Sequence, residues 1–162
     1  MKWLVFLLLA TPALADNTLR ERIVTLSVLS YDDPLKPLFE GAGQTVVVGD
    51  GVEFGLGPTG AQNGLDVAPV RVDIGPRRIE VQFTQPMGLL LDTTFNGYVL
   101  AFATDCALFE SAHVDAAATT LPLTDADITV QGVRLYINVA GLPFTDRSRF
   151  AIDLEVADCP LS

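Results

Sequence analysis

The chain has 162 residues, a net charge of −10 at pH 7 and 49% hydrophobic residues, which fits one globular domain. Its acidity argues against a nucleic-acid partner and against anionic lipid, because both carry negative charge themselves. The same acidity is compatible with cation binding, with a basic partner or with solubility alone.

The first fifteen residues have the pattern of a secretory signal peptide. Lys2 supplies a positive start, residues 3–10 form an apolar run too short to span a bilayer, and residues 13–15, Ala-Leu-Ala, form a small-residue cleavage site. We expect residues 1–15 to be removed, which leaves a single domain over residues 16–162. The mature protein is predicted to be periplasmic or secreted, without a membrane span.

Alternating apolar and polar residues predict short β-strands through the first half of the chain. The first strand is expected at 22–30 and is followed by a loop rich in proline and glycine at 31–44. Short strands at 45–48 and 52–54 flank an Asp-Gly dipeptide, the typical turn of a hairpin. A second glycine-rich loop is expected at 55–64.

The clearest hairpin pattern lies at residues 70–83. Two alternating runs rich in β-branched residues, 70–74 and 78–83, flank a Gly-Pro break. Asp73 and Arg78 are expected to pair across the two strands, because opposite charges on one face of a hairpin attract each other.

The second half of the chain repeats this plan. A turn is expected at 92–96, and strands are predicted at 87–91, 97–103, 108–115, 127–131, 133–139 and 150–156. About ten short strands without an amphipathic helix predict an all-β fold, an antiparallel β-sandwich with a jelly-roll-like layout. A transmembrane barrel would need apolar residues where these strands place Arg, Asp and Glu.

Four segments carry a resemblance to known proteins. They are Gly-Asp-Gly-Val-Glu-Phe at 49–54, Val-Asp-Ile at 72–74, Phe-Asn-Gly-Tyr at 95–98 and Val-Arg-Leu-Tyr-Ile-Asn-Val-Ala-Gly-Leu at 133–142. In this order they resemble the strand and turn motifs of small exported bacterial β-sandwich proteins of unassigned function. The resemblance implies the fold and no particular reaction.

The only two cysteines are Cys106 and Cys159. In an oxidising compartment such an isolated pair predicts one disulfide, which would tie the C-terminus to the turn after the strand at 97–103. One histidine, His113, and two cysteines expected to be oxidised are too few ligands for a zinc site.

Calcium is the metal ion that the sequence suggests, because calcium prefers carboxylate and carbonyl oxygens from loops. Candidate ligands lie in four acidic positions of the first loops and in one later pair: Asp32, Asp33, Asp50, Glu53, and Asp125 with Asp127. The chain contains neither an EF-hand loop nor an acidic nonapeptide repeat, and Asp50 is also an ordinary turn residue before glycine.

No residue is assigned a catalytic role. Ser111, His113 and Asp115 alternate along one predicted strand, but a Ser-His-Asp relay needs the three groups in mutual hydrogen-bond geometry, which strand neighbours do not provide. We expect His113 to be an exposed strand residue. A carboxylate pair for glycoside hydrolysis stays open, because the chain has 20 acidic residues to choose from.

Aromatic residues offer a candidate ligand face. Sugar-binding surfaces use exposed aromatic rings, tryptophan above all, and the only tryptophan, Trp3, lies in the predicted signal peptide. The remaining candidates are Tyr31, Tyr136 and Phe144, with Tyr136 on the polar face of its strand. Phe95 and Tyr98 are expected to pack at the edge of the core or in a turn.

The sequence therefore predicts an exported, non-catalytic β-sandwich module with a binding or structural role. Its expected partner is a glycan or another exported protein. Two alternatives stay open: a hydrolase that acts on polysaccharide through a carboxylate pair, and a subunit of a surface assembly, which would expose a large apolar face.

Overall fold

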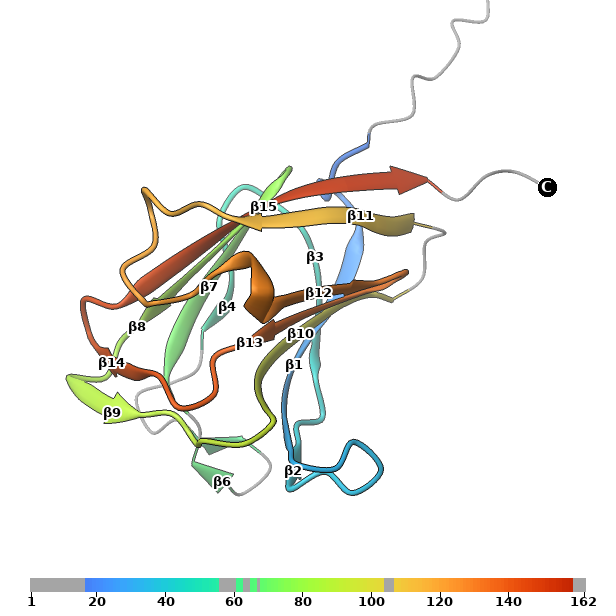
Figure 1. Cartoon of the computed structure of the whole chain (residues 1–162). Coiled ribbons are helices and arrows are strands. Elements are labelled where there is room, and N and C mark those ends of the chain that lie inside the picture. The colour runs from blue at the N-terminus through green and yellow to red at the C-terminus, as the bar shows by residue number, and fades with distance from the viewer. Residues whose placement is uncertain (1–16, 56–60, 63–64, 67, 104–106, 159–162) are drawn as a thin grey trace, which may run out of the picture.

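Antiparallel β-strands account for nearly all of the regular secondary structure in the described part of this computed structural model (Figure 1). The described residues are 17–158 without 56–60, 63–64, 67 and 104–106. Two main sheets, which we name sheet A and sheet B, pack against each other.

Sheet A has the strand order β12-β13-β10-β1-β2, and β3 also pairs with β1. Its strands are β1 (Ile23–Tyr31), β2 (Phe39–Glu40), β3 (Gln44–Val47), β10 (Phe95–Phe102), β12 (Ile128–Gln131) and β13 (Arg134–Asn138). The long pair β1–β10 runs in continuous register from Val24 opposite Phe102 to Tyr31 opposite Phe95, which makes it the centre of the sheet.

Sheet B has the strand order β11-β15-β8-β7-β4. Its strands are β4 (Val52–Gly55), β7 (Val70–Gly75), β8 (Arg78–Phe83), β11 (Ala107–Val114) and β15 (Arg149–Asp158). Two small pairs lie outside the main sheets, β9 (Met87–Leu89) with β14 (Pro143–Thr145) and β5 (Ala61–Gln62) with β6 (Leu65–Asp66), and a short 3-10 turn, η1 (Asp125–Asp127), precedes β12.

Apolar side chains at every second strand position form the core between the two sheets. In β7 and β8 the inward residues of the predicted hairpin are all buried, while the residues between them are exposed or half-buried. Sheet A contributes Leu100, Leu135 and Ile137 in the same way. An antiparallel all-β sandwich is thereby confirmed, and its physical basis is the two-residue period that turns alternate side chains to opposite faces.

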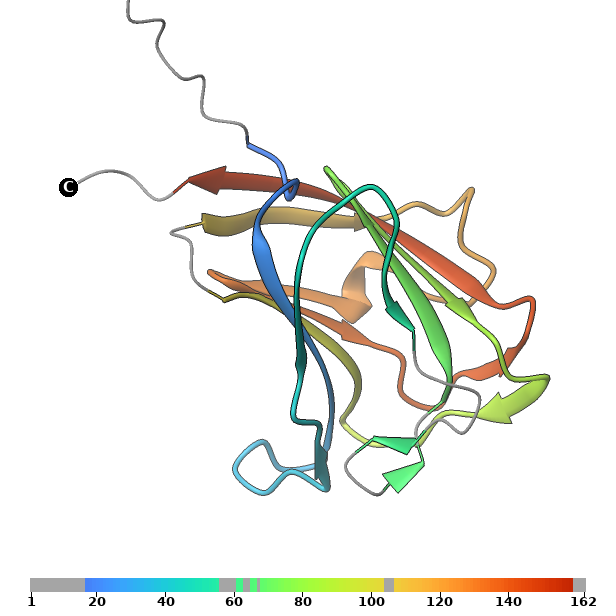
Figure 2. The ribbon, with the colours of Figure 1, turned by 180° about the vertical axis from the view of Figure 1, so that it is seen from behind.

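Every predicted strand forms, but the prediction of a hairpin around the Asp-Gly dipeptide is wrong. β3 pairs with β1 in sheet A, whereas β4 pairs with β7 in sheet B. The connection from β3 to β4 therefore crosses from one layer to the other (Figure 2). Val48 lies buried in this crossing, and its amide donates to the carbonyl of Arg22, so contacts with distant residues hold the crossing in place.

Two further local predictions are also wrong. Residues 92–96 do not form a turn throughout, because Phe95 and Asn96 begin strand β10. Asp73 and Arg78 do not pair, because the turn between β7 and β8 places Asp73 opposite Glu80 and Arg78 opposite Gly75. The predicted disulfide partners, Cys106 and Cys159, lie outside the described residues.

Candidate functional site

Three aromatic side chains meet on the outer face of sheet A. Tyr31 and Phe95 are opposite each other in the β1–β10 register, and their rings stack with centroids 5.3 Å apart. Tyr136 of β13 meets Phe95 edge-on, with centroids 5.9 Å apart. Phe95 is only 6% exposed between the two tyrosines, while both tyrosines stay half-buried and reach solvent.

This aromatic cluster forms the floor of a hollow of about 620 Å³, which we name the outer groove. One wall is the segment after β1 and the other is η1 with β12. Besides the three rings, the groove is lined by Leu29, by Ala126 and by a larger set of polar or proline residues that includes Pro34, Pro37, Glu40, Asp127, Gln131 and Arg134. The groove therefore combines an apolar floor with charged and amide groups on its sides.

Two polar side chains of the outer groove, Arg134 and Asn138, have defined partners. The pKa of Arg134 lies above its usual range, first because it shares a hydrogen bond with Tyr136 and also because Glu40 carries a negative charge nearby. Asn138 accepts from the amide of Asn96 at 3.1 Å and donates to a neighbouring backbone carbonyl, so its orientation is fixed. These contacts preorganise the groove before any ligand arrives.

Gly97 allows strands β10 and β13 to approach each other closely beside this cluster. It lies between Tyr98 and Asn96 in β10, opposite Asn138 of β13. A Cβ atom at Gly97 would overlap the carbonyl oxygen of Ile137, so no other residue fits without displacing a strand. The Phe-Asn-Gly-Tyr segment is thus a strand motif with a required glycine.

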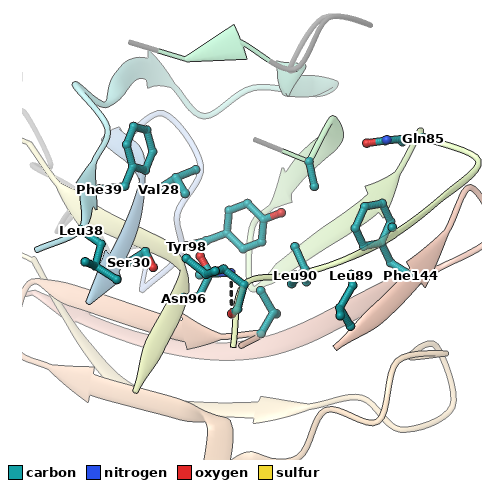
Figure 3. Close-up of a pocket in the computed structure, with 15 residues that line it drawn as sticks. Val28, Ser30, Leu38, Phe39, Gln85, Leu89, Leu90, Asn96, Tyr98 and Phe144 are labelled. Atoms are coloured by element: carbon teal, nitrogen blue, oxygen red, sulfur yellow. Dashed lines mark hydrogen bonds between the residues drawn. The ribbon is translucent and has the colours of Figure 1, made fainter. Parts of the chain in front are cut away.

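A second hollow, of about 510 Å³, opens at the end of the sandwich; we name it the end pocket (Figure 3). Its walls come from β1, the start of β2, β9 and β10. Figure 3 shows the ring of Tyr98 among apolar side chains that include Val28, Leu38, Phe39, Leu89, Leu90 and Phe144. The polar residues in its lining are Ser30, Gln85, Asn96 and Tyr98.

The candidate calcium ligands are not brought together. Asp50 pairs with Arg20, just before β1, whereas Asp32 accepts from the amide of Thr94 beyond the other end of β1. Asp33 accepts from the amide two residues ahead of it, and Glu53 accepts from two backbone amides, at 3.0 and 2.7 Å. Across the described residues, no group of three or more His, Cys, Asp or Glu is arranged to hold a metal ion.

The carboxylates of the later acidic pair, Asp125 and Asp127, also accept hydrogen bonds within the protein. Asp125 accepts from the amide of Val114 and from the ring of His113, which together hold the pKa of Asp125 below its usual range. Asp127 accepts from the amide and the hydroxyl of Thr124 and so caps the η1 turn.

Ser111, His113 and Asp115 do not form a relay. Ser111 donates to Glu155 at 3.0 Å, and the His113 ring lies 3.1 Å from Asp125. Asp115 accepts from Arg78 at 2.7 Å. Each of the three side chains therefore has a different partner, and His113 is exposed as expected.

Of the three aromatic ligand candidates, Tyr31 and Tyr136 lie together in the outer groove, whereas Phe144 is buried. The Phe144 ring stacks on Phe83 with centroids 4.6 Å apart and forms part of the wall of the end pocket. Sequence reasoning missed the central ring, Phe95, because it assigned residues 92–96 to a turn.

Sequence reasoning also missed the role of Tyr98 in the end pocket. The sequence does contain a signal for it. Tyr98 alternates with Leu100 and Phe102, so its side chain is expected to point into the sandwich together with theirs. A polar atom on such a row needs a partner inside the molecule.

Comparisons with protein-family models, with curated proteins and with solved structures give no match for this chain. The resemblance to small exported bacterial β-sandwich proteins therefore stays a prediction. In the described part of the chain, no helix is long and apolar enough to cross a membrane.

Proposed function

We propose that this protein is an exported, non-catalytic module that binds a neutral glycan in the outer groove of sheet A. The observation that carries the proposal is the meeting of Tyr31 and Tyr136 on either side of Phe95 in one open groove. Sugar rings present an apolar face of C–H groups, which packs on aromatic rings, and tyrosine adds a hydroxyl for hydrogen bonding.

The sides of the groove supply the polar contacts that sugar hydroxyls require. Arg134 and Gln131 can donate hydrogen bonds, and Glu40 can accept them, so a ring of hydroxyls would meet both kinds of partner. The ligand is expected to be neutral, because a chain with a net charge of −10 repels polyanionic polysaccharides.

The groove supports binding better than hydrolysis. A glycosidase needs one carboxyl group that acts as an acid and a second that acts as a base or nucleophile. The two acidic side chains in the groove lining are Glu40 and Asp127, and Asp127 already accepts two hydrogen bonds of 2.9 Å from Thr124. The Asp127 carboxylate therefore serves to close the η1 turn.

Binding of soluble neutral hexasaccharides tests the proposal. Residues 16–162 would be titrated calorimetrically with cello-, xylo-, laminari- and chitohexaose, with polygalacturonate as an anionic comparison. We expect at least one neutral oligosaccharide to bind, and Tyr31→Ala and Tyr136→Ala each to weaken it about tenfold through the lost ring contact. Gln82→Ala, on the exposed outer face of sheet B, should leave binding unchanged.

Two results would overturn the proposal. One is the absence of binding to every neutral oligosaccharide while the protein is folded by circular dichroism. The other is the release of new reducing ends during the titration, which would replace the binding module by a hydrolase. Melting curves of the tyrosine variants separate a lost contact from a lost fold.

A further inference from the structure

The hydroxyl of Tyr98 has no hydrogen-bond partner among the described residues, although its side chain is almost fully buried. Tyr98 is 4% exposed, and its ring packs across the sandwich on Phe150, with centroids 6.1 Å apart. Burial also raises the pKa of Tyr98 above its usual range. The Tyr98 oxygen is not one of the fully enclosed unpaired atoms of the described residues, so it keeps some accessible surface and can pair with a molecule that enters the end pocket.

Two other polar residues of the end pocket, Ser30 and Asn96, already have partners within the protein. Ser30 shares a hydrogen bond of 3.3 Å with Thr93, and Asn96 donates to the carbonyl of Leu91 at 3.2 Å. Gln85, the remaining polar residue of the lining, is exposed. Among the described residues of the lining, Tyr98 thus offers a hydroxyl without a protein partner to a molecule in the pocket (Figure 3).

Among the described residues, none that lines the end pocket carries a charged side chain. A carboxylate or ammonium group inside it would lose its hydration without gaining an ionic partner, which is strongly unfavourable. The pocket therefore selects for neutral molecules. Its volume of about 510 Å³ falls within the range of roughly 300–1,000 Å³ that is usual for small-molecule sites.

The residues that line the pocket on its solvent side are unusually apolar for a surface. Leu38 is 59% exposed, Leu89 73% and Leu91 56%, and all three line the pocket. Clustered exposed leucines of this kind mark binding surfaces more often than scattered single ones do. They would contact the part of a ligand that extends away from the Tyr98 hydroxyl.

From these observations we infer that the end pocket is a second binding site, for a small neutral molecule with a hydroxyl or carbonyl group on an apolar skeleton. The polar group would pair with the Tyr98 hydroxyl, which can both donate and accept. This site is separate from the outer groove, because Ser30 and Asn96 face the pocket while their chain neighbours Tyr31 and Phe95 face the groove.

Three aromatic probes of similar size test this inference: 2-naphthol, naphthalene and 2-naphthoate. Calorimetric titration of residues 16–162 should give the tightest binding for 2-naphthol, about fivefold tighter than for naphthalene through one hydrogen bond. The carboxylate probe should bind about tenfold more weakly than 2-naphthol, or worse, because its charge is buried without a partner.

Tyr98→Phe should reduce the affinity for 2-naphthol to that for naphthalene and leave naphthalene binding unchanged. Tyr136→Phe removes the same hydroxyl from the outer groove and should change neither affinity. The comparison of 2-naphthol with naphthalene on the unmodified protein keeps the test independent of how Tyr98→Phe folds.

Several outcomes would overturn the inference. Equal binding of 2-naphthol and naphthalene, tighter binding of 2-naphthoate, or no binding of any probe would each do so. A loss caused by Tyr136→Phe would place the probe in the outer groove instead. Sedimentation showing a dimer that 2-naphthol does not dissociate would identify the leucines as an interface between two copies. The glycan titration uses none of these probes, so either proposal can fail alone.

Discussion

Arg78 holds three carboxylates together on the outer face of sheet B. Its guanidinium donates to Glu80, Asp153 and Asp115, each at 2.7 Å. These contacts connect β8 with β15 and with the residue that follows β11. A single surface ion pair contributes little to stability, but a network around one arginine with fixed geometry contributes more.

The carboxylate of Asp115 is the least exposed of the three. Its pKa lies below the usual range, first because Arg78 donates to it and then because the amide of Ala117 does. A carboxylate whose pKa is lower in the folded than in the unfolded state stabilises the fold above its unfolded pKa, about 4. That stability is lost as the pH falls through the folded pKa.

Asp115→Asn should therefore lower the melting temperature at pH 7, and its difference from the unmodified protein should shrink as the pH falls below about 4. Thermal melts between pH 2 and 7 measure this. Asp73→Asn is the matched control, because Asp73 is exposed and faces Glu80 rather than an arginine. A difference that stays constant with pH would contradict the assignment of the Asp115 carboxylate to this network.

At the scale of elements, β10 is the strand on which both hollows depend. Its outward residue Phe95 lies in the outer groove, and its inward residue Tyr98 lies in the end pocket. The strand can serve both only because it lies between β1 and β13 and approaches β13 closely at Gly97.

Gly97→Ala should lower the free energy of unfolding by about 3 kcal/mol or more, because the added methyl group would overlap the backbone carbonyl of Ile137. A change of side-chain conformation cannot relieve an overlap with the backbone. Urea unfolding measures the change. Gly55→Ala in β4 is the control, since a Cβ there has no atom within 4 Å. A loss for Gly97→Ala no larger than that for Gly55→Ala would show that β13 can shift at little cost.

At the scale of the whole molecule, the acidic residues are distributed rather than gathered. The candidate calcium ligands lie near opposite ends of β1, and Asp32, Asp33, Asp50 and Glu53 each have a partner within the protein. Their charges serve ion pairs, turns and backbone contacts in the described structure.

We accordingly expect the melting temperature of the mature protein to be the same with calcium and with a calcium chelator. A calcium ion bound only by the folded state would add about 3 kcal/mol of stability at a hundredfold excess over its dissociation constant. Differential scanning calorimetry detects a change of that size. A clear upward shift would assign a site to one of the acidic loops, and Glu53→Gln and Asp32→Asn would then locate it.

Part of the candidate site could be predicted from the sequence. Tyr31 and Tyr136 were identifiable as candidates, Tyr136 because it lies on the polar face of its predicted strand and Tyr31 as an aromatic residue of the predicted loop at 31–44. Phe95 was not, because the local composition of residues 92–96 favours a turn. The end pocket was not predictable either, since its walls come from strands and loops far apart in the chain.

By itself, the sequence determined where the longer strands lie and which face of each turns inward, because the two-residue period of a strand is a local property. The short strands β2, β5 and β14 lie outside the predicted strands. Only the tertiary structure decided that β3 pairs with β1 rather than β4, that Arg78 pairs with Asp115 rather than Asp73, and that three distant rings meet in one groove. Strand pairing joins residues far apart in the chain, and its energy depends on all the neighbours in a sheet, which no local pattern records.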